Sequence, residues 1–251
     1  MMPILNIGPL AIQLPGLFLI LGIWLGLSLA ERHAKTYGAN STTLYNLVLV
    51  GLVAGAISAR LAYISRYPAI FGAAPISLFS LNPGLLDLWG GIAGGLIVAL
   101  IYGQRKGLHF WQSLDALTPL MAVFSIAIGL FNLASGAAFG APTQLPWAIY
   151  LWGALRHPSQ IYETLAAVLI LALLWPANKR PNIQPPGVYF LSFIAFSSTA
   201  RLFLDAFRGD SQTLPGGIRT AQMIAWLLLA ACLWRINKLQ ELYQQGENKT
   251  Q

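Results

Sequence analysis

Side chains capable of proton transfer stand directly before an apolar stretch near the middle of the chain. The run RHPSQIYET occupies residues 156–164 and is followed by LAAVLILALLW. Histidine is the residue type that exchanges protons near neutral pH, so His157 is the candidate general base, although a lone histidine there also fits a simple interface contact. Ser159 and Gln160 add hydrogen-bonding groups, and Glu163 adds a carboxylate. These residue types at one end of an apolar helix indicate a site for a charged substrate.

Arginines form a second group of chemically capable residues. Arg60 and Arg201 lie inside apolar segments, where an ionisable side chain costs about 2.5–3.5 kcal/mol. Arg208 follows Arg201 by about two helical turns on the same face. Guanidinium groups stay charged and bind phosphate oxygens in a bidentate manner, so we expect these arginines to bind a phospholipid headgroup. The alternative is that Arg60 and Arg201 reach the headgroups as anchors, or pair with Asp205 and Glu163.

The composition is that of a polytopic membrane protein. Of the 251 residues, 56% are hydrophobic and only 9% are charged, against about 25% charged residues in soluble domains. We predict an all-α polytopic membrane protein of about seven transmembrane helices, each long enough to cross a core of roughly 30 Å. The predicted spans are residues 8–30, 43–64, 85–103, 114–134, 157–176, 186–205 and 217–236.

These spans leave no room for a large soluble domain. Residues 1–236 are therefore expected to form a single transmembrane domain, followed by a short polar cytoplasmic tail at 237–251. Residues 128–140 are interrupted by Gly, Asn and Ser, which predicts a re-entrant or cavity-lining element and not a simple helix. Residues 142–158 contain two Trp and a Tyr, which predicts an arm at the membrane interface.

The net charge of +7 does not indicate nucleic-acid binding, because the basic residues concentrate in alternate connections between spans. This positive-inside pattern places the N-terminus outside and the C-terminus in the cytoplasm if seven spans are present. His157, Arg60 and Arg201 then lie near the outer leaflet. The three histidines lie on opposite sides of the membrane and no second carboxylate accompanies His157, so we expect no metal site, and nothing indicates a cofactor.

With these residues in view, the chain resembles one family along nearly its whole length. HPSQIYE, residues 157–163, is similar to the HPSQ-[LI]-YE motif of the bacterial prolipoprotein diacylglyceryl transferases. Four further stretches resemble motifs of that family in the same order, namely ARLAYI at 59–64, WGGIAGG at 89–95, FNLASGAAFGAPT at 131–143 and RLFLDAFRGD at 201–210.

The resemblance implies a multi-pass enzyme of the bacterial plasma (inner) membrane that needs no cofactor. Members of the family transfer the diacylglyceryl group of phosphatidylglycerol to the cysteine thiol of a preprolipoprotein and release glycerol 1-phosphate. The expected catalytic residues are Arg201 and His157, the latter because it is the only histidine expected on the outer side. The expected substrate-binding residues are Arg60, Asn132, Ser159, Gln160, Tyr162, Glu163 and Arg208.

Three positions depart from the family pattern. The family's histidine before GG is Trp89 here, its signature arginine is Gly129 and its signature glutamate is Ala137. The alternative interpretation is therefore a catalytically inactive relative. Such a protein would bind phosphatidylglycerol or another anionic phospholipid and act as a subunit or scaffold of a membrane complex. The sequence leaves open whether the chain is an enzyme.

Overall fold

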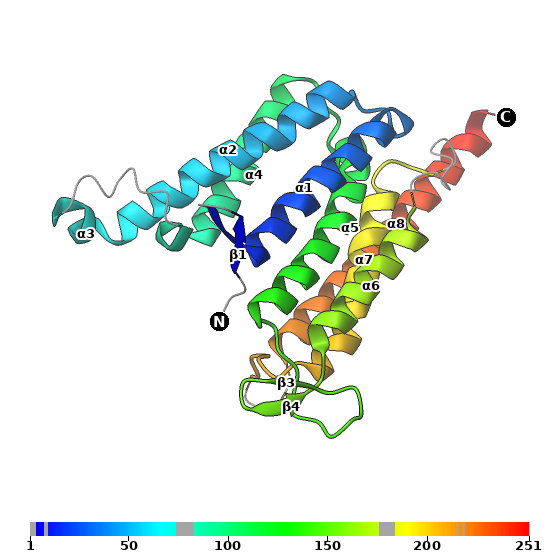
Figure 1. Cartoon of the computed structure of the whole chain (residues 1–251). Coiled ribbons are helices and arrows are strands. Elements are labelled where there is room, and N and C mark those ends of the chain that lie inside the picture. Colours follow the sequence, from blue (N-terminus) through cyan, green and yellow to red (C-terminus); the bar gives the residue numbers. More distant parts are fainter. Residues whose placement is uncertain are drawn as a thin grey trace. The chain divides into compact units, whose positions relative to one another are not determined.

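The computed structural model describes residues 4–7, 10–73, 83–175, 184–214, 216–217 and 219–250, and long helices dominate it (Figure 1). The helices are α1 (Leu14–His33), α2 (Ser41–Arg66), α3 (Pro68–Ala73), α4 (Leu88–Arg105), α5 (Phe110–Ser135), α6 (Ser159–Leu173), α7 (Val188–Leu204) and α8 (Thr220–Thr250). Two antiparallel strand pairs accompany them, β1 (Ile4–Ile7) with β2 (Leu10–Gln13) and β3 (Ile149–Leu151) with β4 (Ala154–Arg156). A 3-10 turn, η6 (Asp205–Phe207), continues α7.

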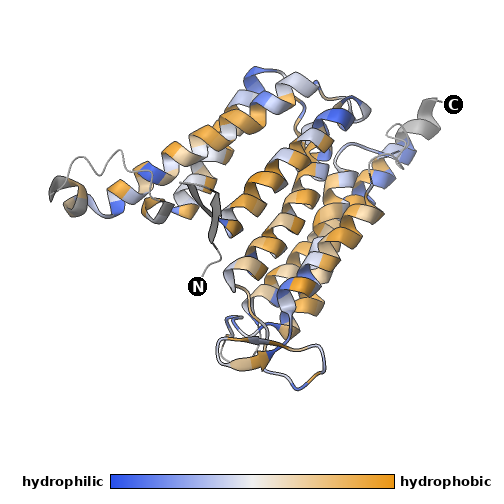
Figure 2. Cartoon of the chain, in the orientation of Figure 1, coloured by the Kyte–Doolittle hydropathy of each residue, from blue (hydrophilic) through white to orange (hydrophobic). Residues whose placement is uncertain are grey.

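Seven of these helices match the seven predicted spans, which confirms the expected all-α polytopic fold. Among the described residues, α1, α2, α5, α7 and α8 are long and apolar enough to cross a membrane. The other two are α4, with 18 residues, and α6, an apolar helix of 15 residues. Apolar residues cover the middle of the long helices, and hydrophilic residues gather near their ends (Figure 2).

The chain divides into two compact units, and each is described by itself. Unit 1 contains Met1–Tyr37 and Leu114–Gln251, and unit 2 contains Gly38–Ser113. In unit 2, α2 packs against α4 through glycines, because a Cβ on Gly95 would lie only 2.8 Å from the backbone oxygen of Gly51. The small residues of the WGGIAGG stretch thus allow two helix backbones to approach closely.

In unit 1, α7 packs against both α6 and α8. A buried cluster on α5, α6 and α7 holds these helices together, and its members are Ala122, Ile170, Leu174, Tyr189 and Phe193. The start of α7 is fixed by Asp115 of α5, whose carboxylate accepts hydrogen bonds from the backbone N–H groups of Gly187 (2.6 Å) and Phe190 (2.8 Å). Such a carboxylate satisfies N–H groups that have no partner within the helix.

The expectation of irregular backbone over residues 128–140 is wrong for its first part. Helix α5 continues without interruption to Ser135, and the chain turns only at Gly136, which has a φ of +71°. Gly129 does not break the helix, because it serves close packing: a Cβ there would lie 3.1 Å from the Cα of Thr164 on α6 and overlap its side chain. The sequence pattern did not distinguish a helix-packing glycine from a helix-breaking one.

The segment expected as an interfacial arm, residues 142–158, contains an ordered hairpin. Strands β3 and β4 pair in an antiparallel register that sets Tyr150 opposite Leu155. The turn residues Trp152 (φ +54°) and Gly153 (φ +78°) both have left-handed backbone conformations, as a two-residue hairpin turn of this kind requires. Its location at the membrane interface stays a prediction.

The last helix, α8, extends without a break to Thr250 and so includes most of the residues expected as a polar tail.

Candidate functional site

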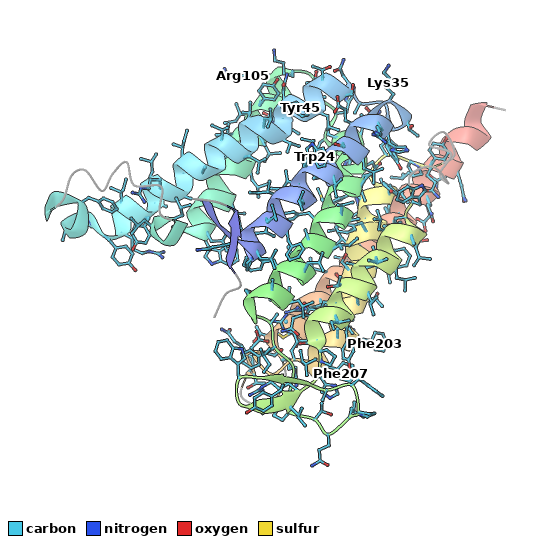
Figure 3. The ribbon with its side chains drawn as sticks, viewed as in Figure 1. Trp24, Lys35, Tyr45, Arg105, Phe203 and Phe207 are labelled. Atoms are coloured by element: carbon cyan, nitrogen blue, oxygen red, sulfur yellow. The ribbon has the colours of Figure 1, made fainter. Side chains whose placement is uncertain are left out.

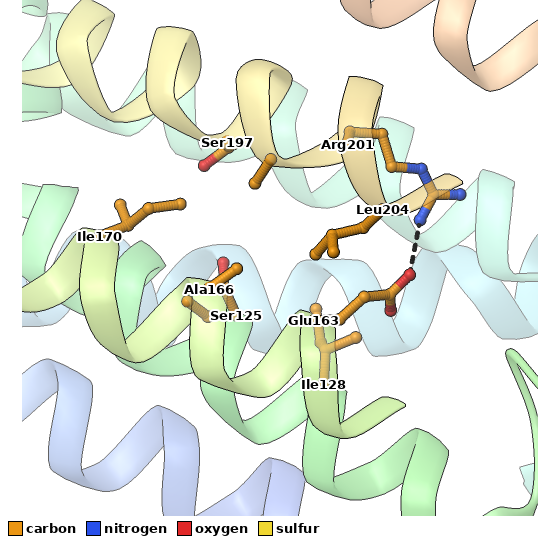
Figure 4. A pocket seen from close by; sticks show the side chains of 10 residues that line it. Ser125, Ile128, Glu163, Ala166, Ile170, Ser197, Arg201 and Leu204 are labelled. Atoms are coloured by element: carbon orange, nitrogen blue, oxygen red, sulfur yellow. Dashed lines mark hydrogen bonds and ion pairs between the residues drawn. The ribbon is translucent and has the colours of Figure 1, made fainter. Parts of the chain in front are cut away.

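Charged side chains from α6, α7 and the segment after α7 meet at one end of unit 1. Glu163 on α6 accepts two hydrogen bonds at the same oxygen, Oε1: from Nη1 of Arg201 (3.1 Å) and from Nη1 of Arg208 (2.8 Å). Arg201 and Glu163 face each other across the space between α7 and α6 (Figure 4). Two guanidinium groups therefore share one carboxylate oxygen, which holds two positive charges close together.

Two aspartates complete this arginine–carboxylate cluster, which we define as Glu163, Arg201, Asp205, Arg208 and Asp210. Asp210 accepts from both Nε and Nη2 of Arg208, at 2.9 and 2.8 Å. Asp205 lies 3.5 Å from Nη2 of Arg201, and Ser211 donates to the same Asp205 oxygen at 2.9 Å. The side chain of Asp205 is fully buried, and its Oδ2 has no hydrogen-bond partner among the described residues.

The two arginines of the cluster differ in accessibility. The side chain of Arg201 is 37% exposed, whereas that of Arg208 is only 12% exposed. Burial by itself would lower the pKa of Arg208, but its hydrogen bonds to Asp210 and Glu163 more than compensate and raise that pKa above its ordinary value. Arg208 is thus a charged, internally paired group, and Arg201 is the more accessible of the two guanidinium groups.

A groove with a volume of about 180 Å³ begins beside Arg201 and Glu163 and continues between α5, α6 and α7. Apart from these two charges its walls are small or apolar (Figure 4), and they are formed by Ser125, Ile128, Ala166, Ala167, Ile170, Ser197, Ala200 and Leu204. A second groove, of about 350 Å³, lies between α7 and α8 and is also lined by Arg201. The guanidinium of Arg201 therefore lines the polar end of two mostly apolar grooves.

An aromatic group adjoins the cluster at the hairpin end of unit 1, where Figure 3 labels Phe207. The ring of Phe207 lies 5.2 Å from that of His157 and 5.8 Å from that of Tyr162. Trp147 donates a hydrogen bond from Nε1 to the hydroxyl of Tyr162 at 2.7 Å. Nδ1 of His157 is buried and has no hydrogen-bond partner in the part of the chain that the structure describes.

The remaining predicted site residues fall into different settings. Ser159 donates to the backbone oxygen of Ala138 (2.7 Å) and Gln160 donates to that of Ala137 (2.9 Å), so both side chains bind the segment after α5. Both are buried. Asn132 lies on the last turns of α5, half-buried, and its backbone oxygen accepts from Ser135.

Arg60 belongs to unit 2. It donates from Nη1 to the backbone oxygen of Leu85 at 2.9 Å, and its guanidinium lies 5.4 Å from the ring centre of Phe71. Trp89, at the start of α4, is 75% exposed. Both residues belong to unit 2, whereas the arginine–carboxylate cluster belongs to unit 1.

Two charged residues near the site, Asp210 and Arg219, were not named from the sequence. Asp205 was named only in the alternative that pairs it with an arginine, and the structure shows it beside Arg201. The two aspartates lie within the RLFLDAFRGD stretch, so their closeness to Arg201 and Arg208 in sequence was a usable signal. Arg219 precedes α8 and donates to the backbone oxygens of Asp205, Ala206 (3.2 Å) and Arg208 (3.0 Å). The sequence gave no such signal for Arg219, because its closeness to the end of α7 depends on how the loop between α7 and α8 folds.

Comparison with known proteins identifies the family. The model of the family "LGT: Prolipoprotein diacylglyceryl transferase" matches residues 3–237 of the chain. The chain belongs to the prolipoprotein diacylglyceryl transferase family. It is accordingly a multi-pass protein of the bacterial plasma membrane. Among the described residues, no group of three or more His, Cys, Asp and Glu side chains is placed to hold a metal ion.

Individual members of the prolipoprotein diacylglyceryl transferase family align with most of the chain. The phosphatidylglycerol–prolipoprotein diacylglyceryl transferase of Aromatoleum aromaticum is 30% identical over 237 residues, which cover 90% of each protein. The protein of the same name from Trichormus variabilis is 31% identical and covers 88% of this chain and 83% of its own length. That of Bordetella parapertussis is 32% identical over 203 residues, 76% of this chain and 78% of its own.

Proposed function

We propose that this protein transfers the diacylglyceryl group of phosphatidylglycerol to the cysteine thiol of a preprolipoprotein. The observation that carries the proposal is the position of Arg201, a partly exposed cation at the polar limit of two mostly apolar grooves. A phospholipid has the matching shape and charge, since its phosphate would meet Arg201 while its acyl chains occupy apolar space. Curated relatives that align with most of the chain bear the name of this activity.

The proposed reaction replaces a carbon–oxygen bond by a carbon–sulfur bond and moves one proton. The thiol sulfur attacks the carbon of the diacylglycerol moiety that carries the phosphate, the bond from that carbon to the phosphate oxygen breaks, and glycerol 1-phosphate leaves. His157 receives the thiol proton, and Arg201 stabilises the negative charge that grows on the departing phosphate. The buried Nδ1 of His157 has no hydrogen-bond partner among the described residues. This supports a role in proton transfer, because such an atom needs a hydrogen-bond partner that a substrate can supply.

The other candidate residues would bind or position. Arg208 is proposed to contribute charge to the phosphate site, and Glu163 to hold it beside Arg201. Tyr162, Ser159, Gln160 and Asn132 are proposed to shape the surroundings of the headgroup. Arg60 is proposed to orient the headgroup as well, and the support for this role is its position inside an apolar segment together with the sequence resemblance.

We further propose that the site faces the outer leaflet, with the N-terminus outside and the C-terminus in the cytoplasm. The distribution of basic residues supports this orientation. In unit 1, Lys35 lies at the end opposite Phe207 and the hairpin (Figure 3), so the site and this basic residue are on opposite sides. The acceptor then reaches the site from outside the cell.

The second candidate function is that of an inactive relative that holds an anionic phospholipid for a partner in a membrane complex. The close packing of Gly129 against Thr164 favours it, because no side chain fits where the family pattern has an arginine. Trp89 and Ala137 replace two more functional groups of that pattern. Losing even one donor that stabilises a developing charge costs roughly 10²–10³ in rate, so three such losses would favour a binding role.

An activity measurement separates the two functions. The protein, purified in detergent, is given labelled phosphatidylglycerol and a peptide with a lipoprotein-type cysteine, and both glycerol phosphate release and peptide lipidation are followed. Transfer should occur, and His157→Ala should reduce it about 10²-fold or more, as expected for loss of a general base. Transfer that survives in His157→Ala contradicts the assignment of the base. Phosphatidylglycerol binding without any transfer supports the second function.

A further inference from the structure

Arg219 makes contacts that neither the sequence resemblance nor the proposed chemistry assigns to it. Its Nη1 donates to the backbone oxygens of Asp205 and Arg208 and its Nη2 to that of Ala206. The last carbonyl groups of a helix have no partner within that helix, and a cation near them is electrostatically favoured. One guanidinium therefore binds three carbonyl oxygens of the short segment that ends α7.

That segment carries two of the five residues of the arginine–carboxylate cluster. Asp205, which approaches Arg201, and Arg208, which binds Glu163, are its first and last residues. Backbone hydrogen bonds also join this part of the chain to the residues that follow α5. The N–H of Ala141 donates to the backbone oxygen of Phe207 (2.8 Å), and the N–H of Gly209 donates to that of Phe139 (2.9 Å). Arg219 adds the anchoring from the α8 side.

We propose that Arg219 is a positioning residue for the phosphate site, which it supports by fixing the backbone from which Arg208 and Asp205 project. This inference rests on the proposed function of the cluster as an anion site. Arg219 itself donates to backbone oxygens and is not assigned a contact with the substrate. Its planar fork is required because one group must reach three carbonyls at once, which the single ammonium of lysine does not reproduce.

The test measures binding of phosphatidylglycerol in mixed detergent micelles, with diacylglycerol, which lacks the phosphate, as the uncharged comparison. Arg219→Lys keeps the charge, and Arg219→Gln keeps hydrogen-bond donors without the charge. Both should weaken phosphatidylglycerol binding about 10-fold, the lower end of what loss of a supporting residue costs. The matched control is Thr220→Val, which removes the neighbouring hydrogen bond from Thr220 Oγ1 to the backbone oxygen of Gln212 (3.1 Å) and should bind as wild type does.

A double-variant measurement distinguishes positioning from general structural support. If Arg219 acts through Arg208, then Arg219→Lys should have little further effect on affinity in an Arg208→Ala background. A purely structural role would instead reduce the number of folded binding sites and leave their affinity unchanged. Unchanged affinity in Arg219→Lys, or equal losses with and without Arg208, would overturn the inference.

The failure of the proposed function has a different signature. Wild-type protein that does not prefer phosphatidylglycerol to diacylglycerol contradicts the anion site itself, and the inference about Arg219 falls with it. Wild-type protein that shows the preference while Arg219→Lys keeps it in full contradicts the inference about Arg219 alone.

Discussion

Each end of helix α7 is bound by a carboxylate of a neighbouring helix, but the groups that these carboxylates bind differ. At the start of α7, Asp115 binds two backbone N–H groups. At its other end, Glu163 binds the side chains of Arg201 and Arg208. The start of the helix is tied by groups that cannot move without unwinding it, whereas the other end is tied by side chains that can change partners.

This difference separates a structural carboxylate from a candidate functional one. Asp115 is 5% exposed, and both its oxygens are used by the helix it caps. The arginine–carboxylate cluster instead presents Arg201 to two grooves. Changes at the start of α7 should therefore reduce stability, and changes at its end should alter lipid binding and transfer.

The largest effect is expected from Arg201→Ala. Removing the cation at the groove should lower lipid transfer by about 10²–10³-fold, the cost typical of losing a donor that stabilises a developing negative charge. Initial rates at varied phosphatidylglycerol concentrations check this. Arg201→Lys should recover only part of the loss, because lysine lacks the bidentate fork. Full activity in Arg201→Ala would contradict the assignment of a functional role to the cluster at the end of α7.

Asp115→Ala should mainly cost stability. It leaves two backbone N–H groups near the start of α7 without their acceptor, and we expect a loss of about 2–4 kcal/mol in the free energy of unfolding. Thermal unfolding in detergent measures this loss, and Asp115→Asn, which keeps an acceptor, should lose less. The affinity of the folded fraction for phosphatidylglycerol should stay that of wild type. A large change in that affinity would show that both ends of α7 serve the site.

Glu163→Gln should strengthen phosphatidylglycerol binding modestly. The variant removes one negative charge beside Arg201 and Arg208, and the corresponding change in Coulomb energy near a solvated site is on the order of 1 kcal/mol, or a few-fold in affinity. Binding measured at low and high salt should show that this gain shrinks with ionic strength. Glu163→Asp, which keeps the charge, is the control. Weaker binding in Glu163→Gln would mean that the negative charge of Glu163, and not only its hydrogen-bonding oxygen, is needed to hold the arginines in place.

An effect of similar size to that of Glu163→Gln is expected from Trp147→Phe, which removes the hydrogen bond to the Tyr162 hydroxyl. The net contribution of one intramolecular hydrogen bond is about 0.5–1.5 kcal/mol, so the rate of transfer should fall by about 10-fold at most. Trp152→Phe is a matched control, because its indole instead donates to the backbone oxygen of Gly136 at 2.9 Å. Equal effects of both changes would mean that only the hairpin as a whole matters. A Trp147→Phe/Tyr162→Phe double variant tests whether the two residues act through each other.

Much of the fold could be predicted because each span is a long apolar segment, and lipid leaves its backbone few conformations other than a helix. The same logic singled out His157, Glu163, Arg201 and Arg208, since charged groups in such surroundings carry a cost. It failed at residues 128–135, where Gly129 packs against α6 and does not break α5. It also did not predict the β3–β4 hairpin, whose three-residue strands are too short for a clear alternating pattern.

The sequence by itself therefore determined that the chain crosses a membrane, where its helices lie and which charged residues needed an explanation. Only the tertiary structure decided how those charges are paired. Glu163 and Arg208 are 45 residues apart in the chain yet 2.8 Å apart in space, and Arg219 returns from a loop to bind the segment that ends α7. The physical reason is that hydropathy depends on each segment alone, whereas charge pairing depends on which helix ends and loops the packed bundle brings together.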